Sequence, residues 1–311
     1  MEFFHKKTSY PFMHTRRVWY VVSAVMILVS IASLAVRGLN FGIDFTGGVV
    51  LELSFPQAAD LEKVRAGLAK AGYGDAAVQS FGTSRDVLVR LLPEEGQDVN
   101  ALGRNVLAAV EAGDPGVELR RTEVVGPQVG QELAEKGALA VLFTFVLILA
   151  YVALRFQWKL GVGAIVAALH DPIVILGVFS LSGLTFDLPA LAAILAVIGY
   201  SLNDTVVVFD RLRERFLSVR KGTAEQIIDM AVNETLSRTI MTSGTTMITV
   251  LALLFFGGEI LRGFATALAI GIVVGTYSSI YIASATALDL KLTARDLLPA
   301  QREKGAVDDM P

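Results

Sequence analysis

Residues 137–154 read GALAVLFTFVLILAYVAL, eighteen consecutive residues without a charged side chain. An α-helix rises about 1.5 Å per residue, so about 20 predominantly apolar residues cross the ~30 Å hydrocarbon core of a bilayer. A helix buried in a soluble protein would show a shorter apolar run and a charged outer face. This stretch therefore indicates a helix that spans a membrane.

Five other windows of the chain share this character, and apolar residues make up 53% of the sequence. The six predicted transmembrane helices cover residues 18–36, 137–154, 161–182, 188–209, 239–256 and 263–288. The first follows Arg16 and Arg17, as a secretory signal would. Its apolar core is longer than the roughly 7–15 residues of a typical signal peptide, which favours an uncleaved membrane anchor.

Lysine and arginine are unevenly distributed over the short connections between these spans. They cluster in the tail 1–17, the hinge 155–160, the loop 210–238 and the tail 289–311, whereas the loops 183–187 and 257–262 contain only Arg262. Cytoplasmic loops of membrane proteins are enriched in these residues. Both termini are therefore predicted to be cytoplasmic, which places the long segment 38–136 on the opposite side of the membrane.

The segment 38–136 has the pattern of a folded α+β domain. Strand-like runs at 47–55, 75–82, 85–92 and 117–126 alternate with two helical patterns at 58–72 and 98–113. Gly72 and Gly113 end the helical patterns, and a Gly-Thr-Ser turn joins the two central strands. The order β-α-β-β-α-β predicts a ferredoxin-like domain, stabilised by packing alone because the chain contains no cysteine.

No motif in the chain predicts a bound cofactor, metal or nucleic acid. The stretch TSGTT at 242–246 lacks the lysine of a phosphate-binding loop, and neither a zinc-protease His-Glu-x-x-His motif nor a dinucleotide-binding glycine pattern occurs. Acidic residues outnumber basic ones in the segment 38–136, which argues against nucleic-acid binding there. We therefore look for the chemistry of this protein within the membrane spans.

Asp204 interrupts the fourth span, in the stretch GYSLNDTVVVFDRLRERF at 199–216. A carboxylate in hydrocarbon costs at least about 2.5–3.5 kcal/mol, so ionisable residues within spans are expected to have a function. Asp204 lies about 8 Å below the cytoplasmic face at 1.5 Å per residue. Arg238 begins the antiparallel fifth span at that same face, so we expect the two side chains to lie at similar depth and to be able to meet.

Further polar residues are candidates for a pathway lining or a helix hinge. Asn203 precedes Asp204, and the cytoplasmic half of the fifth span contains the hydroxyl residues Thr239, Thr242, Ser243, Thr245, Thr246 and Thr249. These hydroxyls have two interpretations, a hydrated lining or ordinary hydrogen bonds to carbonyls of their own helix. His170, Asp171 and Pro172 interrupt the middle of the third span, where the proline loosens the backbone. Adjacent helix residues point about 100° apart, so His170 and Asp171 are not expected to form a bidentate metal site.

Small residues follow one face of the sixth span at intervals of four. The row consists of Gly263, Ala267, Gly271, Gly275, Ser279, Ala283 and Ala287. Such rows allow close helix approach, so Gly271, Gly275 and Ser279 are predicted to be packing positions against another helix of this chain or of a partner.

These features suit a proton-driven machine. Burial favours the protonated form of a carboxyl group, whereas a nearby arginine favours the charged form. A conformational change that moves Arg238 relative to Asp204 would therefore capture or release a proton. One proton that crosses the membrane supplies about 2.3 kcal/mol per 100 mV of potential and ~1.4 kcal/mol per pH unit.

Four stretches of the chain resemble one known family. FGIDFTGG at 41–48, VGPQVG at 125–130, GYSLNDTVVVFDRLRE at 199–214 and SRTIMTSGTT at 237–246 are similar to motifs of the bacterial SecD/SecF family of protein-export membrane proteins. The likeness extends from about residue 20 to 290, with the motifs in the order of that family around six spans.

This resemblance implies a fold and a set of partners. It implies that the chain is one half of a twelve-helix unit of the RND transporter type, completed by the six spans of SecD. It also implies a periplasmic ferredoxin-like domain, a place in the bacterial inner membrane, and assistance to unfolded secretory preproteins that pass through the SecYEG channel. YajC and YidC are further candidate partners, and protons are the coupling ion.

The resemblance also implies roles for two residues. The proton-relay acid and arginine of the family map onto Asp204 and Arg238, and a further acid comes from SecD. Three other interpretations remain: an RND-type exporter of small molecules or lipids, an intramembrane aspartyl protease that uses Asp171 and Asp204, and a scaffold without transport. An exporter normally has two six-span halves in one chain and larger external domains. The acids lack the protease sequence contexts, and a scaffold has no need of Asp204.

Overall fold

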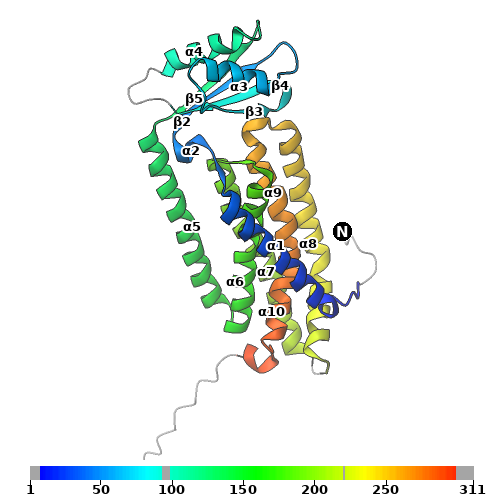
Figure 1. Cartoon of the computed structure of the whole chain (residues 1–311). Coiled ribbons are helices and arrows are strands. Elements are labelled where there is room, and N and C mark those ends of the chain that lie inside the picture. The colour runs from blue at the N-terminus through cyan, green and yellow to red at the C-terminus, as the bar shows by residue number, and fades with distance from the viewer. Residues whose placement is uncertain (1–7, 93–98, 220, 299–311) are drawn as a thin grey trace, which may run out of the picture.

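The computed structural model describes residues 8–92, 99–219 and 221–298. A small α+β domain lies at one end of a bundle of long helices (Figure 1). We call this end of the bundle the domain end and the opposite end the far end. The basic residues Lys6, Lys7, Arg220, Arg302 and Lys304, which contributed to the predicted orientation, lie outside the described residues.

The prediction of six membrane-spanning helices is confirmed: six helices in the described part of the chain are long and apolar enough to cross a bilayer. They are α1 (Arg16–Arg37), α5 (Pro127–Arg155), α6 (Trp158–Ser182), α7 (Leu188–Ser218), α8 (Ala224–Phe256), and a sixth made of α9 (Glu259–Tyr277), the π-helical turn η2 (Ser278–Ala283) and α10 (Ser284–Asp289). Helices α6 and α7 contain the largest share of buried residues, whereas few residues of α1, α5 and α8 are buried. Short 3₁₀ turns, η1 (Met13–Thr15) and η3 (Ala294–Leu297), flank the bundle at the far end.

The expectation of a loop over 210–238 is wrong in its local structure. Helix α7 continues to Ser218 and α8 already begins at Ala224, where Thr223 and Gln226 form a reciprocal capping box. Leu212 and Phe216 of α7 pack in one apolar cluster with Ile227 and Ile228 of α8. Because this packing continues past the predicted spans, the two helices extend beyond them as a hairpin. Ion pairs across the hairpin, such as Arg215 Nε to Glu234 at 2.8 Å, add to it.

The α+β domain has the predicted β-α-β-β-α-β order. Its elements are β2 (Gly48–Ser54), α3 (Leu61–Lys70), β3 (Ala77–Phe81), β4 (Thr83–Leu91), α4 (Val99–Glu111) and β5 (Glu118–Val125). The antiparallel sheet has the order β3-β4-β2-β5, as in the ferredoxin-like fold. Helices α3 and α4 cover one face of the sheet (Figure 1). Asp60 caps α3 by accepting from the backbone N–H of Glu62 and Lys63. The last residues of the predicted domain, from Pro127 onward, already belong to α5.

The two chain crossings between the domain and the bundle pack against each other. The short helix α2 (Ile43–Thr46) and Gly47 precede β2, while Gly126 and Pro127 lead from β5 into α5. Gly47 has a φ of +68°, and a Cβ there would lie 2.7 Å from Pro127 Cα. A Cβ on Gly130 would lie 2.6 Å from Gly47 N. Close approach of these two backbones therefore requires glycine. We call this contact the glycine joint.

A second connection joins the domain to the domain end of α7. The two-residue strands β1 (Asn40–Phe41) and β6 (Thr185–Phe186) pair in parallel, and Arg90 of β4 donates to Phe41 O at 2.7 Å. Asp44 Oδ2 accepts from Leu188 N at 2.9 Å, at the first residue of α7. Burial raises the pKa of the helix-capping residue Asp187, and the neighbouring Asp44 charge adds to this rise. The N-terminus of α7 is thus fixed to the base of the domain.

We predict that Gly130→Ala weakens the glycine joint, because its Cβ would collide with the backbone of Gly47. Overpacking of this kind costs about 1–3 kcal/mol. The apparent thermal midpoint, measured by size-exclusion chromatography after heating, should fall by several degrees. Gly74→Ala is the matched control, since a Cβ there meets nothing within 4 Å. Equal midpoints for both variants would contradict the close packing described here.

Candidate functional site

Asp204 lies in the interior of the bundle, where α7, α8 and η2 meet. It is 7% exposed, and its two carboxylate oxygens accept one hydrogen bond each. Thr239 Oγ1 of α8 donates to Oδ1 at 2.8 Å, and Ser279 Oγ of η2 donates to Oδ2 at 2.7 Å. Both donors are themselves buried. The carboxylate is therefore held by hydroxyl groups from two neighbouring helices.

Arg238 is close enough for its charge to act on Asp204, but it is not paired with it. In the part of the chain that the structure describes, no ion pair joins Arg238 to Asp204. Adjacent residues of a helix point about 100° apart, so Thr239 faces Asp204 and Arg238 points to the exposed side of α8. The first turn of the predicted fifth span, which contains Arg238, lies at the depth of Asp204, but Thr239 and not Arg238 contacts the carboxylate. A permanent structural ion pair is therefore not what retains Asp204.

The hydroxyl residues of α8 divide into two groups. Thr242, Thr245, Thr246 and Thr249 donate to carbonyls of their own helix, as the ordinary interpretation predicts. Ser243 instead contacts Thr276 of α9 at 2.6 Å and accepts from Tyr200 of α7 at 3.2 Å. Asn203, Arg238 and Thr242 are exposed. We call these three the exposed polar residues of α7 and α8; they lie on helices long and apolar enough to cross a bilayer.

His170 and Asp171 form a second polar centre, deeper within the bundle. His170 Nδ1 and Asp171 Oδ1 lie 2.9 Å apart, and Asp171 is fully buried. Asp171 Oδ2 accepts from Ser201 Oγ of α7 at 2.5 Å and from Ser278 Oγ of η2 at 3.0 Å. Although adjacent helix residues point apart, these two side chains turn toward each other and make a direct contact. Among the described residues, no group of three His, Asp or Glu side chains could hold a metal ion.

The π-helical turn η2 connects the two centres. Its consecutive residues Ser278 and Ser279 donate to Asp171 and Asp204, respectively. Sequence reasoning treats Ser279 as a packing position only and does not identify Ser201 or Ser278. The available signal is the polar run of residues 277–279 inside an apolar span. π-Helical turns inside α-helices occur frequently at functional sites.

The small-residue row of the sixth span packs against α7 of the same chain. A Cβ on Gly271 would lie 2.2 Å from Val197 Cγ2, and one on Gly275 would lie 3.0 Å from Ser201 Cβ and 3.5 Å from Asp171 Oδ2. Of the two options left by the sequence, the structure selects an intrachain contact for these glycines. Gly275 also leaves the room that the Asp171 carboxylate occupies.

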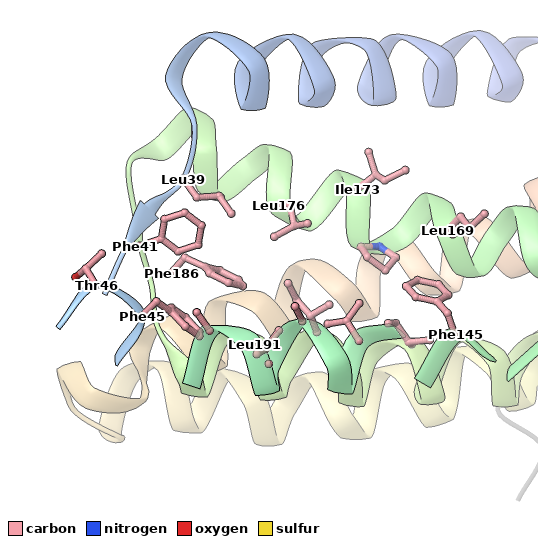
Figure 2. A pocket seen from close by; sticks show the side chains of 17 residues that line it. Leu39, Phe41, Phe45, Thr46, Phe145, Leu169, Ile173, Leu176, Phe186 and Leu191 are labelled. Atoms are coloured by element: carbon pink, nitrogen blue, oxygen red, sulfur yellow. The ribbon is translucent and has the colours of Figure 1, made fainter. Parts of the chain in front are cut away.

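An apolar groove of about 570 Å³ lies between α5, α6 and α7 at the domain end. Figure 2 shows the rings of Phe41, Phe45 and Phe186 at one end of it. Pro172 lines the groove, but His170, Asp171, Asp204 and Arg238 do not. Because its lining is almost entirely apolar, this groove offers no path for a proton.

Comparison with known proteins identifies chains of similar sequence along the whole length. A family model described as "Protein export membrane protein SecD/SecF, C-terminal" matches residues 105–293, and one described as "SecD/SecF GG Motif" matches residues 32–59. The protein translocase subunit SecF of Vibrio alginolyticus is 50% identical over 303 residues, which cover 96% of each chain. The SecF subunit of Escherichia coli O157:H7 is 41% identical over 306 residues and covers 98% of this chain and 95% of its own.

A solved structure shows the same fold. The crystal structure of SecDF, a translocon-associated membrane protein from Thermus thermophilus, matches with a TM-score of 0.83 and 38% identity. The match covers 91% of this chain and 39% of that chain. The chain therefore spans well under half the length of this structural relative.

We predict that Thr239→Val and Ser279→Ala each destabilise the bundle at neutral pH, because each removes a hydroxyl donor from the buried Asp204 carboxylate. A buried polar group that is left without its hydrogen-bond partner costs about 1–3 kcal/mol. Apparent thermal midpoints of the purified variants test this expectation. Thr242→Val is the matched control on the same helix, since its hydroxyl donates only to carbonyls of α8. A loss in the control as large as that in Thr239→Val would refute the special role of the two donors.

Proposed function

The chain belongs to the SecD/SecF family of protein-export membrane proteins, and from this premise we propose that it uses the proton gradient to assist protein export. In this proposal it pairs with SecD and acts on unfolded secretory preproteins that cross the bacterial inner membrane through SecYEG. YajC and YidC are further candidate partners. The observation that carries the proposal is a buried Asp204 carboxylate that is held by hydroxyls alone, beside an arginine that is not paired with it.

Two observations support SecD as the partner. The solved relative is a SecDF chain, and this chain corresponds to 39% of it. The exposed polar residues of α7 and α8, Asn203, Arg238 and Thr242, lie on helices long and apolar enough to cross a bilayer. Polar groups are costly against lipid, so a protein partner is the more favourable cover for these residues. We propose that the six spans of SecD cover them.

The proposed orientation places the far end of the bundle in the cytoplasm and the α+β domain in the periplasm. Basic residues of the far end support it, among them Arg155, Lys159, Arg211 and Arg215. The opposite end has Arg262 in its short loops. This orientation places Asp204 near the cytoplasmic side of the inner membrane.

We propose that Asp204 binds and releases the transported proton. A buried carboxylate without a cation beside it favours the protonated form, and an approaching arginine favours the charged form. Rotation of α8 by about one residue, or 100°, would exchange Thr239 for Arg238 at the carboxylate. Proton uptake with Arg238 turned away and release with Arg238 close would make α7 and α8 alternate between two packings.

The route to the external domain follows α7. Its first residue, Leu188, is bonded to Asp44, and Asp44 lies in the segment between β1 and the glycine joint. Arg90 of β4 donates to Phe41 O in β1, directly before this segment, and so bonds β1 to the sheet of the domain. A shift of α7 is therefore passed to the base of the domain through hydrogen bonds that already exist. We propose that this shift moves the domain against an emerging preprotein.

The protease alternative receives no support from the geometry. A pair of catalytic acids needs to face one shared position, whereas Asp171 and Asp204 accept from two separate sets of hydroxyls. The relatives are named as translocase subunits, which agrees with a transport accessory protein. Co-purification with a second six-span chain would test the partner directly.

We predict that Asp204→Asn abolishes gradient-dependent stimulation of export while the chain still co-purifies with SecD. The amide cannot exchange a proton at neutral pH, but it keeps the size of the carboxylate and one acceptor oxygen for a hydroxyl donor. Precursor release into inverted vesicles or from spheroplasts, measured with and without the gradient, provides the test. Asp210→Asn is the control, because Asp210 lies at the far end of α7 and pairs with Arg155. Normal late-stage release by Asp204→Asn at full gradient would sink the proposal.

We predict a graded series at Arg238. Arg238→Lys keeps the charge but loses the planar guanidinium, so export stimulation should be partly retained, and Arg238→Ala should lose it. Arg213→Ala, on α7 at the same end of the bundle, controls for loss of a positive charge there. The same export assay measures all three variants. Full activity of Arg238→Ala would leave Arg238 with an orienting role only.

A further inference from the structure

The buried pair His170–Asp171 contains a polar atom without a partner. Among the described residues, His170 Nε2 is one of a few buried side-chain atoms that make no hydrogen bond. The imidazole is 2% exposed, and Asp171 is 0% exposed. Buried polar groups in proteins nearly always have a partner, so an orphaned ring nitrogen at this depth calls for an explanation. The relay through Asp204 and Arg238 does not use it.

The hydrogen bonds around Asp171 define the state of the pair. Two serine hydroxyls donate to Oδ2, at 2.5 Å from Ser201 and 3.0 Å from Ser278. We take Asp171 as ionised; an ionised carboxylate only accepts, so its 2.9 Å contact through Oδ1 then requires a hydrogen on His170 Nδ1. In a neutral imidazole the other nitrogen then has a free lone pair. His170 Nε2 is thus a proton acceptor without a donor.

A proton bound at His170 Nε2 would balance the negative charge of Asp171. In the described part of the chain, no lysine or arginine forms an ion pair with Asp171, whose ion-pair partner is His170. An uncompensated buried carboxylate costs several kcal/mol. A proton on Nε2 converts the imidazole to an imidazolium and makes the pair neutral.

We propose that His170–Asp171 is a second proton-binding site of this chain, separate from Asp204. Hydronium gives one proton to the Nε2 lone pair and becomes water, a new N–H bond forms, and the Nδ1–H bond to Asp171 stays intact. Release reverses these changes. The bound species is a hydrated proton, and no other co-reactant takes part.

The surroundings contain few other titratable groups. From the end of α9, the ring of Tyr277 lies 5.8 Å from the ring of His170, and its hydroxyl donates to Trp19 O of α1 at 3.0 Å. From α1, Ser23 also contacts the Tyr277 hydroxyl. From α7, the nearest titratable group in the network is Asp204, which the turn η2 separates from Asp171.

The two proton sites share two structural elements. Ser278 and Ser279 are neighbours on η2 and donate to Asp171 and Asp204, respectively. Ser201 donates to Asp171 and lies one turn before Asp204 on α7, where Thr205 donates to its carbonyl. A change of charge at either carboxylate therefore acts on the same turn and the same helix. This coupling rests on the proposed role of Asp204, whereas proton binding by His170 does not.

Nitrogen-15 NMR of the imidazoles tests the second site on the native residue. The sequence contains three histidines, His5, His14 and His170. The complex of the full chain with SecD is labelled at histidine, placed in nanodiscs and titrated from about pH 5 to 9. Exposed His14 is the internal reference, and His14→Gln in a His5→Gln background assigns His170. We expect the His170 ring to start as the Nδ1–H tautomer at high pH and to become an imidazolium within this range.

Two variants sharpen the result. Asp171→Asn removes the compensating charge and should abolish the titration of His170, while that of His14 stays unchanged. Asp204→Asn should leave His170 able to titrate but move its midpoint by about 1 pH unit if the sites are coupled. Co-purification with SecD shows that each variant remains assembled.

The outcomes separate the second site from the proposed function. A His170 ring that stays in one neutral tautomer from pH 5 to 9 overturns the second site, even if Asp204→Asn abolishes export. A titrating His170 together with normal export by Asp204→Asn supports the second site and contradicts the Asp204 relay. A titration of His170 that persists unchanged in Asp171→Asn refutes the paired site.

Discussion

Two carboxylates inside the apolar bundle need hydrogen-bond donors, and much of the structure follows from that constraint. Asp171 and Asp204 lie on different helices, yet both depend on hydroxyl donors from one turn, η2. Consecutive residues of a helix point in different directions, so Ser278 can serve α6 while Ser279 serves α7. The last span is π-helical at the turn where it contacts the two buried carboxylates, Asp171 and Asp204. Hydrocarbon offers no substitute donors.

Close packing of small residues makes this arrangement possible. A Cβ on Gly271 would lie 2.2 Å from Val197, and one on Gly163 would lie 2.6 Å from Ala283 O of η2. Gly177 similarly accommodates Ser30 where α1 crosses α6. Short hydroxyl side chains reach the carboxylates only because the helix backbones come this close. The hydrogen bonds to the two carboxylates therefore depend on the close packing that the small-residue row allows.

The same helix that holds Asp204 is bound to the α+β domain at its other end. Leu188 N bonds to Asp44, and the segment that contains Asp44 leads into the glycine joint at Gly47. The two crossings between the domain and the bundle pack on each other, and Arg90 adds a hydrogen bond to Phe41 O. These few residues connect the helix that contains Asp204 to the base of the domain.

The sequence by itself determined the six spans, the β-α-β-β-α-β domain and the presence of a carboxylate, Asp204, inside the fourth span. Each is a matter of local pattern: apolar length, strand and helix periodicity, and a carboxylate where hydrocarbon penalises it. The row of glycines in the last span was also legible as a packing face, but not which helix it meets.

Only the tertiary structure decided the partners of these residues. Whether Arg238 or Thr239 faces Asp204 depends on the rotation of α8, a difference of one residue that periodicity within an apolar span does not reveal. The contact between His170 and Asp171, the orphaned Nε2, and the sharing of η2 by two acids require the packing of α6, α7 and the last span together. The ends of α7 and α8 differ from the predicted ends for the same reason. Both helices continue past the apolar spans because Leu212 and Phe216 of α7 pack against residues of α8.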